Sequence, residues 1–274
     1  MLFHKFDLHT HSLASDGTCT PTEVVRQAVA EGMTMLALSD HDNMNGIVEA
    51  AEEARRLGIP FLPSVEMETE FPEELHILGL DVDPQNAALS QALALCTKRR
   101  DMRNEMILDL LAGIGCEVRP FLDRTPGTIT RKHIAFALCD GGFARNTADA
   151  LSRYLRPGCP AYAEVTRFTK KEVIDLILGA GGIPVLAHPC QLKCEVAPLV
   201  EELVSYGLKG IEAYYSEAKL KQVAEHCGLA KQHDLLITSG SDFHGTYRMG
   251  TAIGCAYQEV AALEDCYQFF MARK

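Results

Sequence analysis

The chain has 274 residues, of which 47% are hydrophobic and 23% charged, and its formal net charge is −11 at pH 7. This length suits a single α/β barrel with an insertion, and the acidic balance argues against a protein that coats long nucleic acid. No stretch approaches the ~20 apolar residues that span a bilayer, and the first residues lack the apolar segment of a signal peptide, so we expect a cytoplasmic protein that does not enter membranes.

Seven apolar runs, taken in chain order, predict buried strands. They are Phe6–His11, Met35–Ser39, Pro60–Glu66, Leu75–Val82, Ile183–Ala187, Gly210–Tyr214 and Leu235–Ser239. Helix signals lie between several of them. Thr20, Pro21 and Glu23 combine an N-cap, a first-turn proline and a capping-box glutamate, and Ile47–Leu57 stops at Gly58. Strands that alternate with helices indicate βα units and a mainly parallel sheet.

This alternation breaks between about residues 85 and 164. Asn86–Ile114, Ile129–Asp140 and Ala148–Tyr154 are predicted helices. The apolar face expected for the first consists of Leu89, Leu93, Leu95, Met102, Met106, Leu110 and Leu111, and its basic face of Lys98, Arg99, Arg100 and Arg103. We therefore expect a barrel domain of residues 1–84 and 165–274, with residues 85–164 forming a helical subdomain inserted over the barrel mouth.

Side chains that bind metals stand at the ends of most predicted strands. His9 and His11 are two residues apart on a strand, so their imidazoles point to the same face. Asp242 and His244 repeat this spacing after the last strand. Glu66 would be a costly buried charge without a cation nearby, and its two oxygens allow it to bridge two metals. The remaining candidates are Asp16, His41, His76 and His188, with Asp40 expected to orient a neighbouring ligand.

Each candidate also has an ordinary role open to it, as a turn carboxylate or a core histidine. Nine of them together favour one shared site, and hence a multinuclear metal hydrolase. A ligand set of nitrogen and oxygen alone suits zinc, manganese or iron(II) in a reactive site. The ten cysteines form no CxxC pair and are expected to be small core residues, although Cys190 and Cys194 follow His188 closely enough to be candidates for the site mouth.

Several motifs together resemble the PHP (polymerase and histidinol phosphatase) family. The resemblance spans nearly the whole chain outside the insertion, and its motifs are Asp7–Ser12, Ser39–His41, Glu66, Ala187–Pro189 and Ser241–His244. It implies an α/β fold with a distorted (β/α)₇ barrel and up to three divalent metals. Carried over by motif, the first metal falls to His9, His11, Glu66 and Asp242, the second to Glu66, His76 and His188, and the third to Asp16, His41 and His244.

The helical insertion resembles that of family members that act on nucleotides, namely a nucleoside 3′,5′-bisphosphate phosphatase and a 5′-to-3′ exonuclease for short RNA. The segment Ile129–Ala135 is similar to their insertion motif, which implies that Arg131 binds a substrate phosphate. Arg145 and His133 are further candidates for substrate binding. Bidentate guanidinium contacts suit a phosphate group.

The expected reaction is hydrolysis of a phosphomonoester, most specifically the 3′-phosphate of a nucleoside 3′,5′-bisphosphate, by a hydroxide that bridges two metals. Coordination lowers the pKa of water from about 16 to near 7. His41, His188 and Asp242 are the expected catalytic residues. His41 and His188 are candidates to protonate the leaving group, in competition with a metal-bound water. The alternatives are an exonuclease on short oligoribonucleotides, a histidinol-phosphate-type phosphatase, and a metal-binding module without turnover.

Overall fold

The structure is a computed structural model that describes residues 4–122, 128–247, 250–256 and 260–273. The chain divides into two compact units. Met1–Ala92 together with Arg167–Lys274 form the first, which we call the α/β unit, and Leu93–Thr166 form the second, the helical unit. None of the described helices is both long enough and apolar enough to cross a membrane.

The α/β unit contains two sheets. In the first, β1 (Phe6–Asp7), β2 (Met35–Leu38) and β3 (Phe61–Pro63) are all parallel. The second has the order β4–β5–β6–β7–β8, with β5 antiparallel to both neighbours and the last three strands parallel. Its strands are β4 (Val65–Glu68), β5 (His76–Leu80), β6 (Ile183–Leu186), β7 (Gly210–Tyr215) and β8 (Leu236–Gly240).

Backbone hydrogen bonds join the two sheets at two places, after β1 and after β2. On one side the amide of Leu8 donates to the carbonyl of Ser239 over 2.9 Å, and on the other the amide of Asp42 donates to the carbonyl of Glu66 over 2.9 Å. The strands therefore follow one another around a nearly continuous ring, as expected for a distorted PHP-type barrel. All seven predicted runs contain observed strands. The run Pro60–Glu66 divides between β3 and β4 because Pro63 has no amide hydrogen and the chain changes sheets at Ser64.

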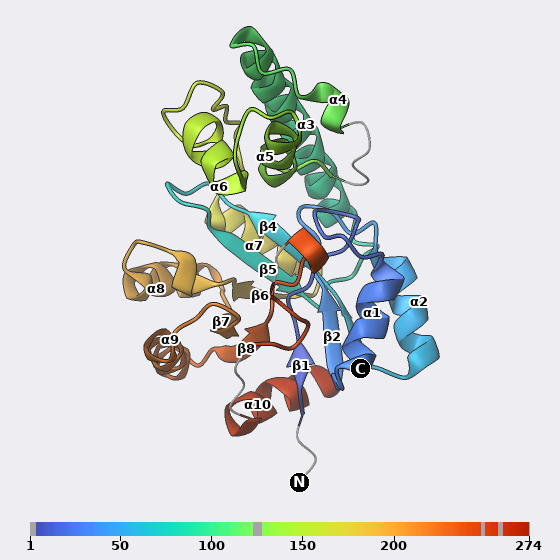
Figure 1. Ribbon diagram of the computed structural model, residues 1–274. Coiled ribbons are helices and arrows are strands. Elements are labelled where there is room, and N and C mark those ends of the chain that lie inside the picture. The colour runs from blue at the N-terminus through green and yellow to red at the C-terminus, as the bar shows by residue number, and fades with distance from the viewer. Residues whose placement is uncertain (1–3, 123–127, 248–249, 257–259, 274) are drawn as a thin grey trace. The chain divides into compact units, whose positions relative to one another are not determined.

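Helices pack on the outside of these strands (Figure 1). α1 (Pro21–Ala30) begins with the predicted capping box, in which Thr20 Oγ1 accepts from the amide of Glu23 and Glu23 Oε2 accepts from the amide of Thr20. α2 (Ile47–Leu57) is capped by Gly58, whose φ of 74° is a left-handed conformation. Glycine adopts it without strain because it has no Cβ. The other helices of this unit are α7 (Lys170–Gly179), α8 (Val196–Tyr206), α9 (Leu220–Gln232) and α10 (Val260–Met271).

The core of the α/β unit includes the buried faces of its helices. Val24, Val25 and Ala28 of α1 pack in one cluster with Leu36 and Leu38 of β2. Every residue of β2 and β6 is buried, which matches the unbroken apolar runs in the sequence.

α3 (Ala87–Gly113) begins in the α/β unit and continues into the helical unit. The helical unit also contains α4 (Arg119–Leu122), α5 (Arg131–Asp140), α6 (Thr147–Ala150) and a π-helical segment, Leu151–Leu155. Its core joins Ile107, Leu108 and Leu111 of α3 to Ile134 and Leu138 of α5.

The predicted faces of α3 were partly wrong. Met102 and Met106 are 55% and 48% exposed, whereas Arg100 and Arg103 are 8% and 3% exposed. The buried face is the one that carries Ile107, Leu108 and Leu111, and Arg100 and Arg103 lie on that same side of the helix at helical spacing. Apolar residues occupy more than one face of α3, so their pattern alone did not indicate which face packs inward.

Candidate metal centre

The predicted ligands occupy segments that follow or belong to the strands. His9 and His11 follow β1, His41 follows β2, His188 follows β6, and Asp242 with His244 follows β8. Thr10 forms a parallel bridge with Phe243, which sets the segment after β1 beside the segment after β8. Glu66 lies within β4, and His76 begins the neighbouring strand β5. The ring of strands therefore brings together residues from both ends of the chain.

Glu66 lies at the centre of this group. Its Oε2 is 3.3 Å from Nε2 of His9, 3.3 Å from Nε2 of His11 and 3.0 Å from Nδ1 of His41. Its Oε1 is 2.9 Å from Nδ1 of His76 and 3.0 Å from Nε2 of His188. One carboxylate that is 1% exposed thus faces five imidazoles with both of its oxygens.

The other two carboxylates complete the cluster. Asp242 Oδ1 is 3.2 Å from Nε2 of His11 and 3.3 Å from Nδ1 of His244. Asp16 Oδ1 is 3.1 Å from Nε2 of His244 and 3.7 Å from Nε2 of His41. The structure therefore brings all nine predicted ligands into one group. Within it, His11, Asp16, His41 and His244 offer ligand atoms that all lie within 4.8 Å of one another, as do two further sets, His9 with His11 and Glu66, and His41 with Glu66 and His76.

These residues fit divalent metal ions. Nε2 of His9, Nε2 of His11 and Oε2 of Glu66 are buried and have no hydrogen-bond partner in the described part of the chain. Buried polar atoms normally find a partner, so ligand atoms that converge without one indicate a cation. Imidazole and carboxylate donors without thiolates are the set that zinc, manganese and iron(II) accept in reactive sites.

Comparison with known proteins gives the same answer. Residues 7–124 match the model of the PHP domain. The chain is 36% identical over 259 residues to a 3′,5′-nucleoside bisphosphate phosphatase of Chromobacterium violaceum, with 91% of this chain and 90% of the relative covered. The chain belongs to the PHP domain family.

Two further comparisons agree with this membership. A 5′-3′ exoribonuclease of Haemophilus influenzae is 35% identical, with 88% of this chain and 90% of the relative covered. A solved structure described as an amidohydrolase from Chromobacterium violaceum, with bound sulfate and no metal, superposes with a TM-score of 0.88 at 32% identity, covering 98% of this chain and 96% of the other. This PHP-domain chain is a metal-dependent phosphoesterase, and thus a hydrolase.

The electrostatics of the PHP site keep its acids ionised. Burial alone would raise the pKa of Glu66, but the positive charges of His76, His9 and His41 outweigh it and hold that pKa well below its usual range. Asp16 and Asp242 behave likewise beside charged imidazoles. Burial lowers the pKa of His76, yet the charge of Glu66 and its hydrogen bond raise it to about 9. Without metal, the raised pKa values of His9, His11, His41 and His76 favour their protonated forms beside these carboxylates.

Other buried acids hold the ligands in place. Asp7 Oδ1 accepts from the amides of Ser241 and His9 over 3.0 and 3.2 Å. Asp40 accepts from the amide and the hydroxyl of Ser12 over 2.8 and 2.7 Å, and from the hydroxyl of Ser15. It therefore orients the loop that leads to Asp16. Hydrogen bonds of this kind fix the orientation of ligands around a metal.

Sequence reasoning missed Glu212 and Tyr215 of β7. Glu212 is 1% exposed and lies 3.1 Å from Nδ1 of His9, and the hydroxyl of Tyr215 donates to Asp242 Oδ2 over 2.7 Å. A signal was available for the first, because Glu212 is a charge inside the apolar run Gly210–Tyr214. A buried charge of that kind needs a partner.

The three predicted substrate-binding residues all lie in the helical unit. Arg131 donates through Nη2 to the carbonyl of Ala163 over 2.9 Å and stacks on the ring of Tyr162. His133 is buried, and its Nδ1 accepts from the amide of Thr130 at the start of α5. The side chain of Arg145 is 85% exposed and pairs with Asp149. Substrate binding by these residues stays a prediction.

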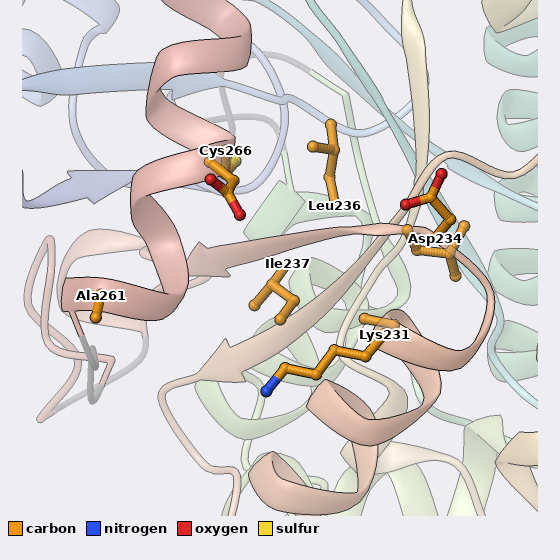
Figure 2. Close-up of a pocket in the computed structure, with 9 residues that line it drawn as sticks. Lys231, Asp234, Leu236, Ile237, Ala261 and Cys266 are labelled. Carbon is orange, nitrogen blue, oxygen red and sulfur yellow. The ribbon is translucent and has the colours of Figure 1, made fainter.

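A separate pocket of about 590 Å³ lies at the other end of β8 (Figure 2). Leu236 and Ile237, at the start of that strand, line it together with Asp234 and Cys266. Asp242 and His244 follow the end of β8, so this pocket is distinct from the metal centre.

Cys190 and Cys194 are partly buried, and none of the ten cysteines, all of which lie in the described part of the chain, forms a disulfide.

Proposed function

We propose that the chain hydrolyses a phosphomonoester, specifically the 3′-phosphate of a nucleoside 3′,5′-bisphosphate. The observation that carries the proposal is the Glu66 cluster, in which the two oxygens of one carboxylate face ligands assigned to different metals. The similarity to a 3′,5′-nucleoside bisphosphate phosphatase supports the choice of substrate.

We assign two to three divalent ions, Mn, Fe or Zn, to this cluster. His9, His11, Glu66 and Asp242 hold the first ion. Glu66 holds the second together with His76 and His188, whose ring nitrogens lie 3.2 Å apart. Asp16, His41 and His244 hold the third. When bound, such ions lower the pKa of water and neutralise the charge of a phosphoryl group.

The protein's own residues would then position the substrate and move protons. His41 and His188 are the candidates for the leaving-group proton, since both line the cluster and their ring nitrogens lie within 3.0 Å of Glu66. Asp242 is an ionised carboxylate whose Oδ1 faces both His11 and His244. Arg131, with Arg145 and His133, would bind the second phosphate or the nucleotide body. Residues 85–164, taken together, would form the inserted subdomain that carries these groups.

The test is phosphate release from a panel of nucleotides and sugar phosphates, with the metal content measured on the same sample. A nucleoside 3′,5′-bisphosphate should release its 3′-phosphate in the presence of Mn²⁺, at a rate far above those for sugar phosphates. No phosphate from any nucleotide would contradict the proposal. Asp242→Asn should lose both bound metal and hydrolysis, while an Asp242→Asn variant that retains both would remove this residue from the site.

A short-RNA exonuclease is the second candidate, because the chain is 35% identical to a 5′-3′ exoribonuclease. The same assay separates the two activities. Short 5′-phosphorylated oligoribonucleotides would be shortened to mononucleotides by an exonuclease and left intact by a strict bisphosphate phosphatase.

A further inference from the structure

Glu212 links two histidines that belong to different proposed metal positions. Its Oε1 is 3.1 Å from Nδ1 of His9, and its Oε2 accepts a hydrogen bond from the backbone amide of His188 over 2.7 Å. The Glu212 side chain is completely buried. Both of its oxygens are therefore committed to groups that hold metal ligands.

The surroundings of Glu212 are built for this carboxylate. The pairing of β7 with β8 shifts register between Glu212 and Tyr214, which marks an irregularity in the strand at this point. Gly240 of β8 pairs with Tyr215, and a Cβ at Gly240 would collide with Glu212 Oε1 and with the Cβ of His9. A glycine at this position therefore leaves the space that the Glu212–His9 contact occupies.

The contact with His9 sets which ring nitrogen faces the cluster. A carboxylate beside Nδ1 favours the proton on that nitrogen, so that Nε2 presents its lone pair. Nε2 of His9 is the atom that lies 3.3 Å from Glu66 Oε2, inside the cluster. Glu212 thus selects the tautomer of His9 that can bind a metal.

The contact with His188 holds a strained backbone. His188 has a φ of 29° and a ψ of 54°, in the left-handed region that residues with a Cβ seldom adopt. This conformation places Nε2 of His188 3.0 Å from Glu66 Oε1. A hydrogen bond from the His188 amide to a fully buried carboxylate offsets part of the cost of holding the residue there.

We propose that Glu212 is a positioning residue that binds no metal itself and sets the geometry of the first and second metal positions together. This inference rests on the metal assignments of the proposed function. It implies that one substitution outside the ligand set weakens two metal positions at once. The third position, at Asp16, His41 and His244, makes no contact with Glu212 among the described residues and should remain.

The test compares Mn²⁺ binding by the wild-type chain, Glu212→Gln and Glu212→Asp. Glu212→Gln keeps the size of the side chain but turns an amide NH₂ toward one of the two donors. Affinity at two positions should fall about 10–100-fold, the usual effect of removing a partner that orients a ligand. Electron paramagnetic resonance gives a second readout, because two ions bridged by Glu66 should show a spin-coupled signal that the variant replaces with that of an isolated ion. Glu212→Asp keeps a carboxylate and should retain part of the coupled signal.

A control variant guards against a general loss of folding. Glu201→Gln, on an exposed position of α8, should bind metal as the wild-type chain does. Circular dichroism of the metal-free proteins checks that each variant is folded.

The outcomes are distinguishable. Selective loss of two ions and of the coupled signal in Glu212→Gln, or a partial loss of both in Glu212→Asp should the first variant not fold, supports the inference. Coupled ions bound with unchanged affinity in both variants overturn it and leave the proposed function standing. A wild-type chain that binds no divalent metal and releases no phosphate overturns the proposed function and the inference with it.

Discussion

Replacing Glu66 with glutamine is the sharpest test of the metal centre. The change conserves the shape of the side chain but removes its charge and turns one oxygen into an NH₂ group. In the structure both oxygens are used, one by His9, His11 and His41 at 3.0–3.3 Å and the other by His76 and His188 at 2.9–3.0 Å. Glu66→Gln therefore affects two proposed metal positions, whichever way the amide turns.

The expected size of the effect follows from this double use. Removing a group that only orients a ligand costs about 10–100-fold in metal affinity, so loss of a shared anionic ligand should cost at least about 100-fold at each of the two positions. That is about 2.7 kcal/mol for each ion, at 1.36 kcal/mol for every tenfold change. Loss of the charge stabilisation that these ions give a phosphoryl group should lower kcat/KM about 10³-fold or more.

The assay is a chelator competition for Mn²⁺ followed by phosphate release on the same samples. Glu68→Gln is the matched control, because Glu68 lies two residues further along β4 and pairs with Arg167 over 3.0 Å. It should keep its metal ions. A Glu66→Gln variant that binds metal within a few-fold of the wild type would refute the placement of Glu66 between two ions.

Three other predictions concern pH, stability and the substrate. His76 is protonated below its pKa of about 9 in the metal-free chain, so binding must displace that proton, and the apparent Mn²⁺ affinity measured by titration should rise with pH from 6 to 9; a flat profile would contradict this. Hydrogen bonds from Arg56 and Arg26 lower the pKa of Glu53 to about 2, so its stabilising effect is present above pH 4.5 and lost as pH falls toward 2. Thermal unfolding should show Glu53→Gln to be less stable than the wild type at pH 7, with the difference shrinking in acid. Arg131→Ala should raise KM for a nucleoside bisphosphate more than it lowers kcat, and an unchanged KM would remove Arg131 from substrate binding.

The strands and the ligands were open to prediction because both have strong local signatures. A short apolar run such as Met35–Ser39, bounded by polar residues, is typical of a buried strand. A histidine or acid directly after such a run therefore lies at a strand end. The capping box at Thr20 was equally local, since it needs only four neighbouring residues.

The features that the sequence did not indicate depend on contacts between distant parts of the chain. Asp40 was expected to orient a neighbouring ligand, and it does so through Ser12 and Ser15 on another loop, which no local pattern indicated. Glu212 required knowledge that β7 passes beside the segment after β1. Which face of α3 is buried depends on where α5 packs. The sequence alone therefore led us to predict Arg100 and Arg103 on an exposed basic face, whereas both are buried.

The pairing of Leu8 with Ser239 also bears on how the chain acquires its ions during synthesis. The first ligands leave the ribosome more than two hundred residues before the last, and the backbone hydrogen bond that aligns the two segments cannot form until Ser239 has emerged. Until then a nascent chain lacks Asp242 and His244, which the first and third proposed positions require. Metal binding at those two positions is consequently a late event, coupled to the closure of a long-range contact that is slow to form.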